Sequence, residues 1–215
     1  MNSRTFIAYR VAQGLKDGDI VNLGIGIPTL VPKFISQDKK VVFQAENGII
    51  GIAAATNPPT PNVFDAGGSS ASVAPGGQLI NSAESFGLIR SGKVDVTVLG
   101  ALQVDSKGNL ANWQIPGKMV VGYGGAMDLV TCAKKVIIAM EHTAKGTPKI
   151  LEECEFPLTG VGCVSEIITE LGVFEVTPTG LVLTEMSSTT TLDEIKEKTK
   201  ANYQVAEDLK INQIN

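Results

Sequence analysis

The sequence predicts an α/β domain: a mostly parallel open sheet flanked by helices, with a late antiparallel addition. Up to about residue 140, short apolar runs alternate with helix-forming stretches, an order typical of parallel strands joined by helices. Two later apolar runs enclose Thr177-Pro178-Thr179-Gly180, whose Pro and Gly placement predicts a hairpin turn. A length of 215 residues suits one domain, so we treat residues 1–215 as one unit with terminal tails at 1–4 and about 204–215.

The first part of the chain contains a predicted helix and two strands. Apolar residues from Ile7 to Leu15 fall on one helical face, and Gly18 ends this helix. Residues 20–23 form a short buried strand, after which two glycines and Pro28 predict a tight turn into a second helix. Residues 41–44 form the next strand, so Glu46 lies on the loop that follows it.

The remaining elements continue this pattern. Residues 53–78 are rich in Ala, Gly, Pro, Ser, Asn and Thr, with Pro58-Pro59-Thr60-Pro61 at their centre, and predict a long irregular loop. Thr191 and Glu194 indicate a capping box before a charged helix that runs to Lys200. The other predicted elements are helices at 82–90 and 126–130, buried strands at 94–99 and 136–140, a turn at 105–109, and hairpin strands at 173–176 and 181–184.

The composition favours a compact enzyme and excludes several other classes. The net charge is −4 with basic residues spread singly, and no apolar run approaches the ~20 residues of a spanning helix, so we expect neither nucleic acid nor a membrane as partner. Cys132, Cys154 and Cys163 are odd in number and lack CxxC spacing, which indicates a reducing, cytoplasmic location. His142 is the single histidine, so a histidine-based metal site cannot form, and no neighbouring nucleophile gives it more than a structural role.

Glu46 is the carboxylate that most needs an explanation. It ends an apolar strand, no basic residue lies within five positions, and Gly48 and Gly51 follow it closely. Burying an unpaired carboxylate is costly, so Glu46 is either capped by backbone amides or used in chemistry. The local sequence leaves both interpretations open.

Two glycine clusters are candidate binding loops. Gly24-Ile25-Gly26-Ile27-Pro28-Thr29 begins like a dinucleotide fingerprint but lacks the third glycine, so it indicates a tight strand-to-helix turn. That turn brings Asn22 to the carboxyl end of its strand, where it either orients a ligand or caps the turn. Gly122-Tyr123-Gly124-Gly125 offers successive backbone amides to a phosphate or an oxyanion, although close packing explains it equally well.

Seven short sequence blocks occur in order along the chain. They are Val21-Asn22-Leu23-Gly24-Ile25-Gly26-Ile27-Pro28, Glu46-Asn47-Gly48, Ser85-Phe86, Leu99-Gly100-Ala101-Leu102-Gln103-Val104, Leu110-Ala111-Asn112-Trp113, Pro116-Gly117-Lys118-Met119 and Gly124-Gly125-Ala126-Met127-Asp128-Leu129-Val130. Each block is weak alone, and their order makes the set specific. Together they resemble the B (beta) subunit of family I 3-oxoacid CoA-transferases. The pattern is most similar to the bacterial acetate or butyrate:acetoacetate enzymes and runs from about residue 4 to 210.

The resemblance implies a catalytic role for Glu46 as the nucleophile that carries CoA as a glutamyl thioester, with the backbone amide of Gly125 holding the oxyanion. CoA is then a substrate, and no metal or permanently bound cofactor is expected. A partner alpha subunit is implied, in a heterotetramer. Substrate contacts are implied for Asn22, Gly24, Gly26, Asn47, Gly124 and Asn112.

Several residues depart from the family pattern and leave the acyl substrate open. Ala45 stands where Ser is common, Ala53-Ala54 replace Gly-Pro, and Tyr123 replaces Met. Gly68 stands where the mammalian ketone-body enzymes carry a lysine, which argues against succinate. We expect acetoacetate with acetate or butyrate, with 3-oxoadipate or succinate as alternatives. A sugar-phosphate isomerase-like enzyme is the remote alternative, because that chemistry also uses a carboxylate and a glycine loop.

Overall fold

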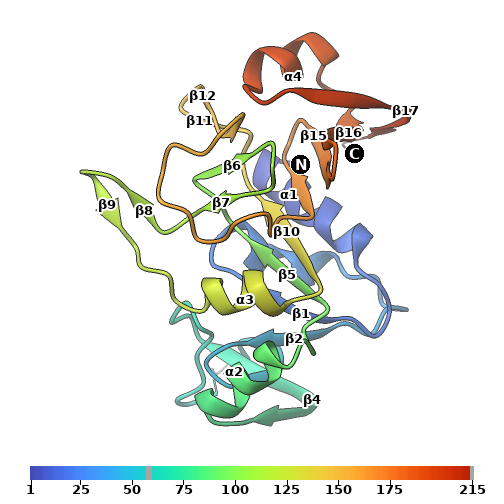
Figure 1. Ribbon diagram of the computed structural model, residues 1–215. Helices are drawn as coiled ribbons and strands as arrows, with labels where there is room; N and C mark the ends of the chain where they lie inside the picture. The colour runs from blue at the N-terminus through green and yellow to red at the C-terminus, as the bar shows by residue number, and fades with distance from the viewer. Residues whose placement is uncertain (57–59, 214–215) are drawn as a thin grey trace.

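The computed structural model describes residues 1–56 and 60–213. Within these ranges a ten-stranded mixed sheet crosses the molecule in the order β17-β16-β15-β14-β10-β5-β1-β2-β3-β4 (Figure 1). The predicted α/β class with a mostly parallel sheet is confirmed. The central strands are parallel to one another: β2 (Val42–Ala45), β1 (Ile20–Leu23), β5 (Val96–Leu99), β10 (Lys135–Ala139) and β14 (Glu166–Ile168).

Helices cover both faces of these parallel strands. On one face, α1 (Ser3–Gly14) and the 3-10 helix η1 (Ile27–Phe34) pack apolar side chains against the strands, including Val96 and Val98 of β5. On the other face, α2 (Ser82–Arg90) and α3 (Ala126–Cys132) contribute to a core that includes Leu99 of β5. Because successive strand residues point to opposite faces, strands buried on both faces need nearly continuous apolar sequence, which is the signal that the sequence carries.

Antiparallel strands extend the sheet at both ends. The sequence predicted only those near the C-terminus. β15 (Gly172–Thr177) and β16 (Gly180–Ser187) form the predicted hairpin. At the other end, β3 (Ile49–Ala54) and β4 (Ala71–Leu79) pair antiparallel with β2 and with each other.

The predicted loop at 53–78 is therefore wrong at both of its ends, which belong to β3 and β4. β4 is an edge strand, where Pro75 and its neighbouring glycines are tolerated because one row of backbone groups needs no partner. The composition of these two segments is that of a loop, so their place in the sheet, and not their local sequence, makes them strands. Pro58 and Pro59 lie outside the described residues.

The predicted terminal tails are also wrong. α1 begins at Ser3, where the side chain of Asn2 accepts a hydrogen bond from the Thr5 amide at 2.9 Å. β17 (Tyr203–Asn212) pairs parallel with β16, and Asn212 donates a hydrogen bond to Glu185 of that strand. Its half-buried positions recur every third residue, and its pairing with β16 shifts register once, so the alternation that marks a strand in sequence is absent.

Smaller elements complete the described part of the chain. The capping prediction for α4 (Leu192–Lys198) is half confirmed: Thr191 accepts from the Glu194 amide, but the Glu194 carboxylate accepts from the Thr190 hydroxyl instead of the Thr191 backbone. No helix in the described residues is long and apolar enough to cross a membrane. The short strands are β6 (Gln103–Asp105), β7 (Leu110–Ala111), β13 (Ile150–Leu151), β11 (Thr143–Ala144), β12 (Thr147–Pro148) and the projecting hairpin of β8 (Gln114–Ile115) and β9 (Met119–Val120) (Figure 1).

Candidate active site

Glu46 lies on the tight turn between β2 and β3, at the carboxyl end of a parallel strand, and its side chain is half-buried. Gly48 in the same turn has a φ of +119°, and a Cβ there would lie 2.1 Å from the carbonyl oxygen of Ile80. The Ile80 amide also donates to the Gly48 carbonyl at 2.9 Å. Glycine is therefore required at this position, and the turn that carries Glu46 is fixed against the chain that leaves β4.

Asn22 is the side chain that holds the Glu46 carboxylate. It is fully buried on β1, and its Nδ2 donates to Oε2 of Glu46 at 3.2 Å. The same Nδ2 donates to Oε1 of Gln44 at 2.8 Å and to the Gln44 carbonyl at 3.2 Å. The carboxylate is thus held by a side-chain amide, at an edge of the sheet where open α/β sheets bind ligands.

Gln44 and Ser85 are site residues that the sequence did not single out for a role. Both are buried, and Gln44 Nε2 donates to Ser85 Oγ of α2 at 2.7 Å. Ser85 Oγ in turn donates to the carbonyl of Ala45 at 3.3 Å. A glutamine in the otherwise apolar β2, two residues before a lone glutamate, is the signal that could have revealed this chain of hydrogen bonds.

Gly125 lies directly against Glu46. It is the N-cap of α3, and a Cβ there would lie 3.2 Å from Cγ of Glu46 and 3.3 Å from Cζ of Phe86. No backbone hydrogen bond within the described residues uses the N–H of Gly125 as donor. The neighbouring Gly124 is exposed and has a φ of +51°, which a side chain rarely adopts. The predicted glycine loop therefore lies beside the predicted nucleophile.

Gly24 and Gly26 form the turn that follows Asn22. The Gly24 amide donates to the Val98 carbonyl at 2.8 Å, and a Cβ there would lie 3.0 Å from Cδ2 of Leu99. Gly26 has a φ of +96° and caps η1. Their observed contacts are those of a tight turn at the carboxyl ends of β1 and β5, and a role for them in binding substrate stays a prediction.

The side chains of Asn47 and Asn112 are engaged with other segments. Asn47 Nδ2 donates to the Phe64 carbonyl at 2.8 Å and so ties the Glu46 turn to the segment before β4. Asn112 Nδ2 donates to the Gly100 carbonyl at 3.2 Å, and its Oδ1 accepts from the Thr159 hydroxyl at 2.6 Å. These bonds stabilise loops, and contact of either residue with substrate stays a prediction.

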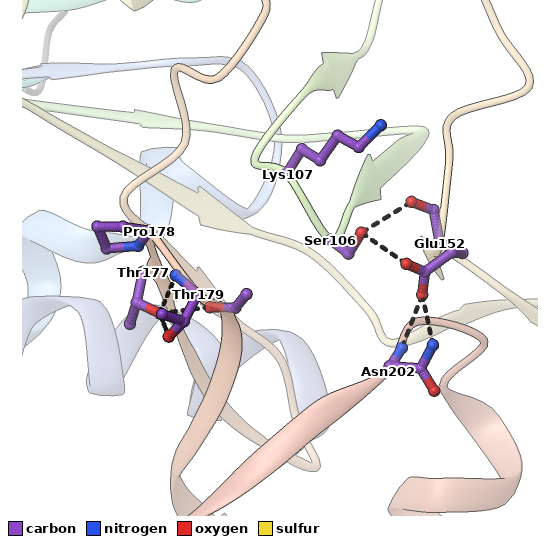
Figure 2. A pocket seen from close by; sticks show the side chains of 8 residues that line it. Ser106, Lys107, Glu152, Thr177, Pro178, Thr179 and Asn202 are labelled. Atoms are coloured by element: carbon purple, nitrogen blue, oxygen red, sulfur yellow. Dashed lines mark hydrogen bonds between the residues drawn. The ribbon is translucent and has the colours of Figure 1, made fainter.

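Two cavities in the described chain differ in their distance from Glu46. One of about 190 Å³ is lined by Asn47 and Gly48 of the Glu46 turn. Another of about 440 Å³ is lined by Lys107, Glu152 and the Thr177–Gly180 turn, and Figure 2 shows Glu152 held by Ser106 and Asn202. Because β15 runs antiparallel to β14, this turn lies at the amino ends of the parallel strands, opposite the edge that carries Glu46. The Glu46 side chain instead lies beside Gly125 at the start of α3, where Tyr123 of the glycine loop and Met127 of the first turn of α3 are exposed.

A family model described as coenzyme A transferase matches residues 4–198. The chain belongs to the coenzyme A transferase family. The beta subunit of the acetate CoA-transferase of Escherichia coli (strain K12) is 50% identical over 210 residues, which are 97% of each chain. The B subunit of the succinyl-CoA:3-ketoacid coenzyme A transferase of Helicobacter pylori (strain ATCC 700392 / 26695) is 46% identical over 205 residues, 94% of this chain and 99% of the relative.

These relatives identify the CoA-transferase chain as a beta-type subunit of family I. A solved structure of an acyl-CoA transferase from Escherichia coli O157:H7 has the same fold, with a TM-score of 0.79 at 23% identity. The CoA-transferase chain aligns over 98% of its own length and over 43% of that longer chain. Membership of the coenzyme A transferase family excludes the alternative of a sugar-phosphate isomerase-like enzyme.

Proposed function

We propose that this CoA-transferase chain moves CoA between an acyl-CoA and a short-chain carboxylate, with Glu46 as the covalent carrier. One observation carries the proposal: Asn22 holds the Glu46 carboxylate, and Cγ of the same side chain lies beside Gly125. A carboxylate nucleophile and a backbone amide that donates to no carbonyl of the described residues are the two groups that acyl transfer at a thioester requires.

The first half of the reaction loads CoA onto the enzyme. A carboxylate oxygen of Glu46 attacks the thioester carbon, the carbon–sulfur bond breaks, and CoA leaves as the thiolate, giving an acyl-glutamyl anhydride. The thiolate then attacks Cδ of Glu46 and displaces the free acid as its carboxylate. The product is a glutamyl-CoA thioester, and no proton, metal or oxidant is consumed.

The second half reverses these steps with the acceptor acid. Its carboxylate attacks Cδ of Glu46 and releases the CoA thiolate, which then attacks the acyl carbon of the new anhydride and restores the Glu46 carboxylate. Each exchange replaces one carboxylate by another, so the energies are nearly balanced. Every addition places negative charge on a carbonyl oxygen, and one well-placed donor such as the Gly125 amide is worth about 3 kcal/mol there.

Acetoacetate with acetate or butyrate is the substrate set that we infer, with 3-oxoadipate and succinate as alternatives. The relative from E. coli is named for acetate and the one from H. pylori for succinyl-CoA and a 3-ketoacid, at 50% and 46% identity. Residues Ala53 and Ala54, which depart from the family pattern, lie at the end of β3 and so on the strand that follows the Glu46 turn. A substrate panel of acetate, butyrate, succinate and 3-oxoadipate separates these possibilities.

A partner alpha subunit completes the enzyme in this proposal, in a heterotetramer. Relatives named as beta or B subunits support it, as does the acyl-CoA transferase chain of which this fold covers 43%. We infer a cytoplasmic location from the three free cysteines.

The test compares glutamate variants in the purified complex with the alpha subunit. Glu46→Gln keeps the side-chain size and removes the nucleophile, so kcat is expected to fall about a thousandfold or more. Glu175→Gln, at an exposed position of β15, is the matched control and keeps wild-type kcat. Near-normal turnover by Glu46→Gln would exclude Glu46 as the nucleophile.

A further inference from the structure

We propose that Gln44 is a positioning residue, which acts through Asn22 to keep an N–H donor on the Glu46 carboxylate. The inference rests on the proposed function of Glu46. It concerns a buried hydrogen-bond chain that runs from Ser85 of α2 through Gln44 of β2 to Asn22 of β1 and then to Glu46.

The direction of every bond in this chain follows from its far end. The Ser85 hydroxyl donates to the Ala45 carbonyl, so its oxygen is available as an acceptor for Gln44 Nε2 at 2.7 Å. That bond places Oε1 of Gln44 toward Asn22, which donates to it at 2.8 Å. Asn22 consequently presents Nδ2, and not its carbonyl oxygen, to Glu46.

Reversing the Asn22 amide would be strongly unfavourable while Gln44 is present. Its oxygen would then face three other oxygens: Oε1 and the carbonyl of Gln44, and Oε2 of Glu46. Asn22 and Gln44 are 0% and 3% exposed, so water screens this repulsion little.

The other end of the Asn22 amide offers no comparable support. Oδ1 of Asn22 is buried without a hydrogen-bond partner among the described residues, and the same holds for Oγ1 of Thr97. Thr97 lies level with Asn22 on the neighbouring β5. Without the Gln44 side chain, the Gln44 carbonyl and Oε2 of Glu46 remain as acceptors at 3.2 Å, but the shortest of the three bonds to Nδ2, at 2.8 Å, is lost. The Gln44 side chain therefore supplies the shortest of the contacts that keep Nδ2 of Asn22 toward the carboxylate.

This orientation matters because charge on the Glu46 carboxyl group changes during the reaction. The same group is a carboxylate, then a thioester carbonyl, and an oxyanion each time its carbon is attacked. A fixed N–H donor stabilises the charged forms without reorganising, whereas a reversed amide would repel them.

A double-variant cycle in the complex with the alpha subunit tests the proposal, with the single-turnover rate of glutamyl-CoA formation from acetoacetyl-CoA as readout. Gln44→Met keeps the volume and removes both hydrogen bonds, and it is expected to lower this rate about tenfold. Asn22→Ala is expected to lower it about a hundredfold. Because Gln44 acts through Asn22, the double variant should match Asn22→Ala within about twofold.

Two further variants keep the outcome decisive. Thr97→Val changes the same buried row without removing a hydrogen bond, so its rate should stay within about twofold of wild type. Ser85→Ala takes the place of Gln44→Met in the cycle if the latter does not fold. A wild-type rate in both Gln44→Met and Ser85→Ala overturns the proposal, as does a double variant whose losses multiply. Neither result bears on Glu46 as the nucleophile, because that role is tested separately by Glu46→Gln.

Discussion

Two clusters of buried polar side chains, one around Glu46 and one around His142, differ in how completely their hydrogen bonds are satisfied. His142 is fully buried, with Nδ1 paired to the Thr169 hydroxyl and Nε2 to the Thr199 hydroxyl, both at 2.9 Å. Each threonine hydroxyl is also tied to backbone, at Gly172 and Ile195. Every polar atom of the imidazole is used inside the protein, which is the pattern of a structural group.

The cluster around Glu46 is incomplete by comparison. Asn22 Oδ1 has no partner among the described residues, and Glu46 itself is half exposed beside Gly125. A buried amide oxygen that lacks a partner costs stability, so its persistence beside a half-exposed carboxylate at the end of a parallel strand favours a function. The completeness of hydrogen bonding, more than burial, therefore distinguishes the Glu46 cluster from the His142 cluster.

Among the variants that probe the difference between these two clusters, the largest effect is predicted for filling the space between Gly125 and Glu46. In Gly125→Ala the added methyl group would meet Cγ of Glu46 at 3.2 Å, so the carboxylate must shift, and kcat should fall about a hundredfold. Gly160→Ala is the matched control, since its methyl group meets Val130 and Cys163 at 2.8 Å, away from Glu46. The control should lower the free energy of unfolding by about 1–3 kcal/mol without changing kcat. Equal losses of kcat in both variants would show that the effect of Gly125→Ala does not depend on its contact with Glu46.

A smaller effect is predicted for the pH dependence of stability through His142. Burial, reinforced by Lys198 and Lys149, lowers the pKa of His142 to about 4. The unfolded chain, with a pKa near 6.5, binds the proton first, so the free energy of unfolding falls as pH drops from about 6.5 toward 4. Between pH 7 and 5 this contributes a loss of about 2 kcal/mol. The free energy of unfolding, measured with denaturant at each pH, should change less between pH 7 and 5 in His142→Gln than in wild type. An equal change in both proteins would refute the lowered pKa of His142.

The smallest effect is predicted for thiol reagents. Burial, with the nearby Asp105 carboxylate, raises the pKa of the Cys154 thiol to about 12 and that of Cys163 to about 11. Both thiols therefore stay protonated near pH 8 and should be alkylated slowly. Iodoacetamide labelling of the native complex, followed by peptide mass spectrometry, should leave these two cysteines largely unmodified. Rapid labelling of Cys154 with loss of activity would show instead that this thiol is reactive and needed for turnover.

The parts of the fold that sequence predicted are those with a local signal. β1, β2 and the turn with Glu46 follow from apolar runs that end in glycines, and α2 begins and ends at the predicted residues 82 and 90. β17 escaped prediction because its half-buried residues recur every third position, and β4 escaped because Pro75 and two glycines hide an edge strand. Edge pairing depends on neighbours distant in sequence, which local pattern does not encode.

The candidate site divides in the same way. Glu46, Asn22 and Gly125 were predicted as the central residues, and the structure brings them together. Gln44 and Ser85 were not assigned a role, because their bond joins residues 41 positions apart and depends on how α2 packs on the sheet. Asn112 was predicted as a binding residue, yet its observed bonds join Gly100 and Thr159.

Trapping the covalent intermediate shows directly whether Glu46 carries CoA. The complex with the alpha subunit is incubated with acetoacetyl-CoA and quenched at neutral pH with hydroxylamine, which converts a glutamyl-CoA thioester to a hydroxamate and releases CoA. A sample without acetoacetyl-CoA controls for hydroxylamine cleavage at Asn47-Gly48. Peptide fragmentation should place the hydroxamate on Glu46 and nowhere in the Glu46→Gln complex. A hydroxamate on another residue, or none in a complex that turns over, would contradict the role of Glu46 as the covalent carrier of CoA.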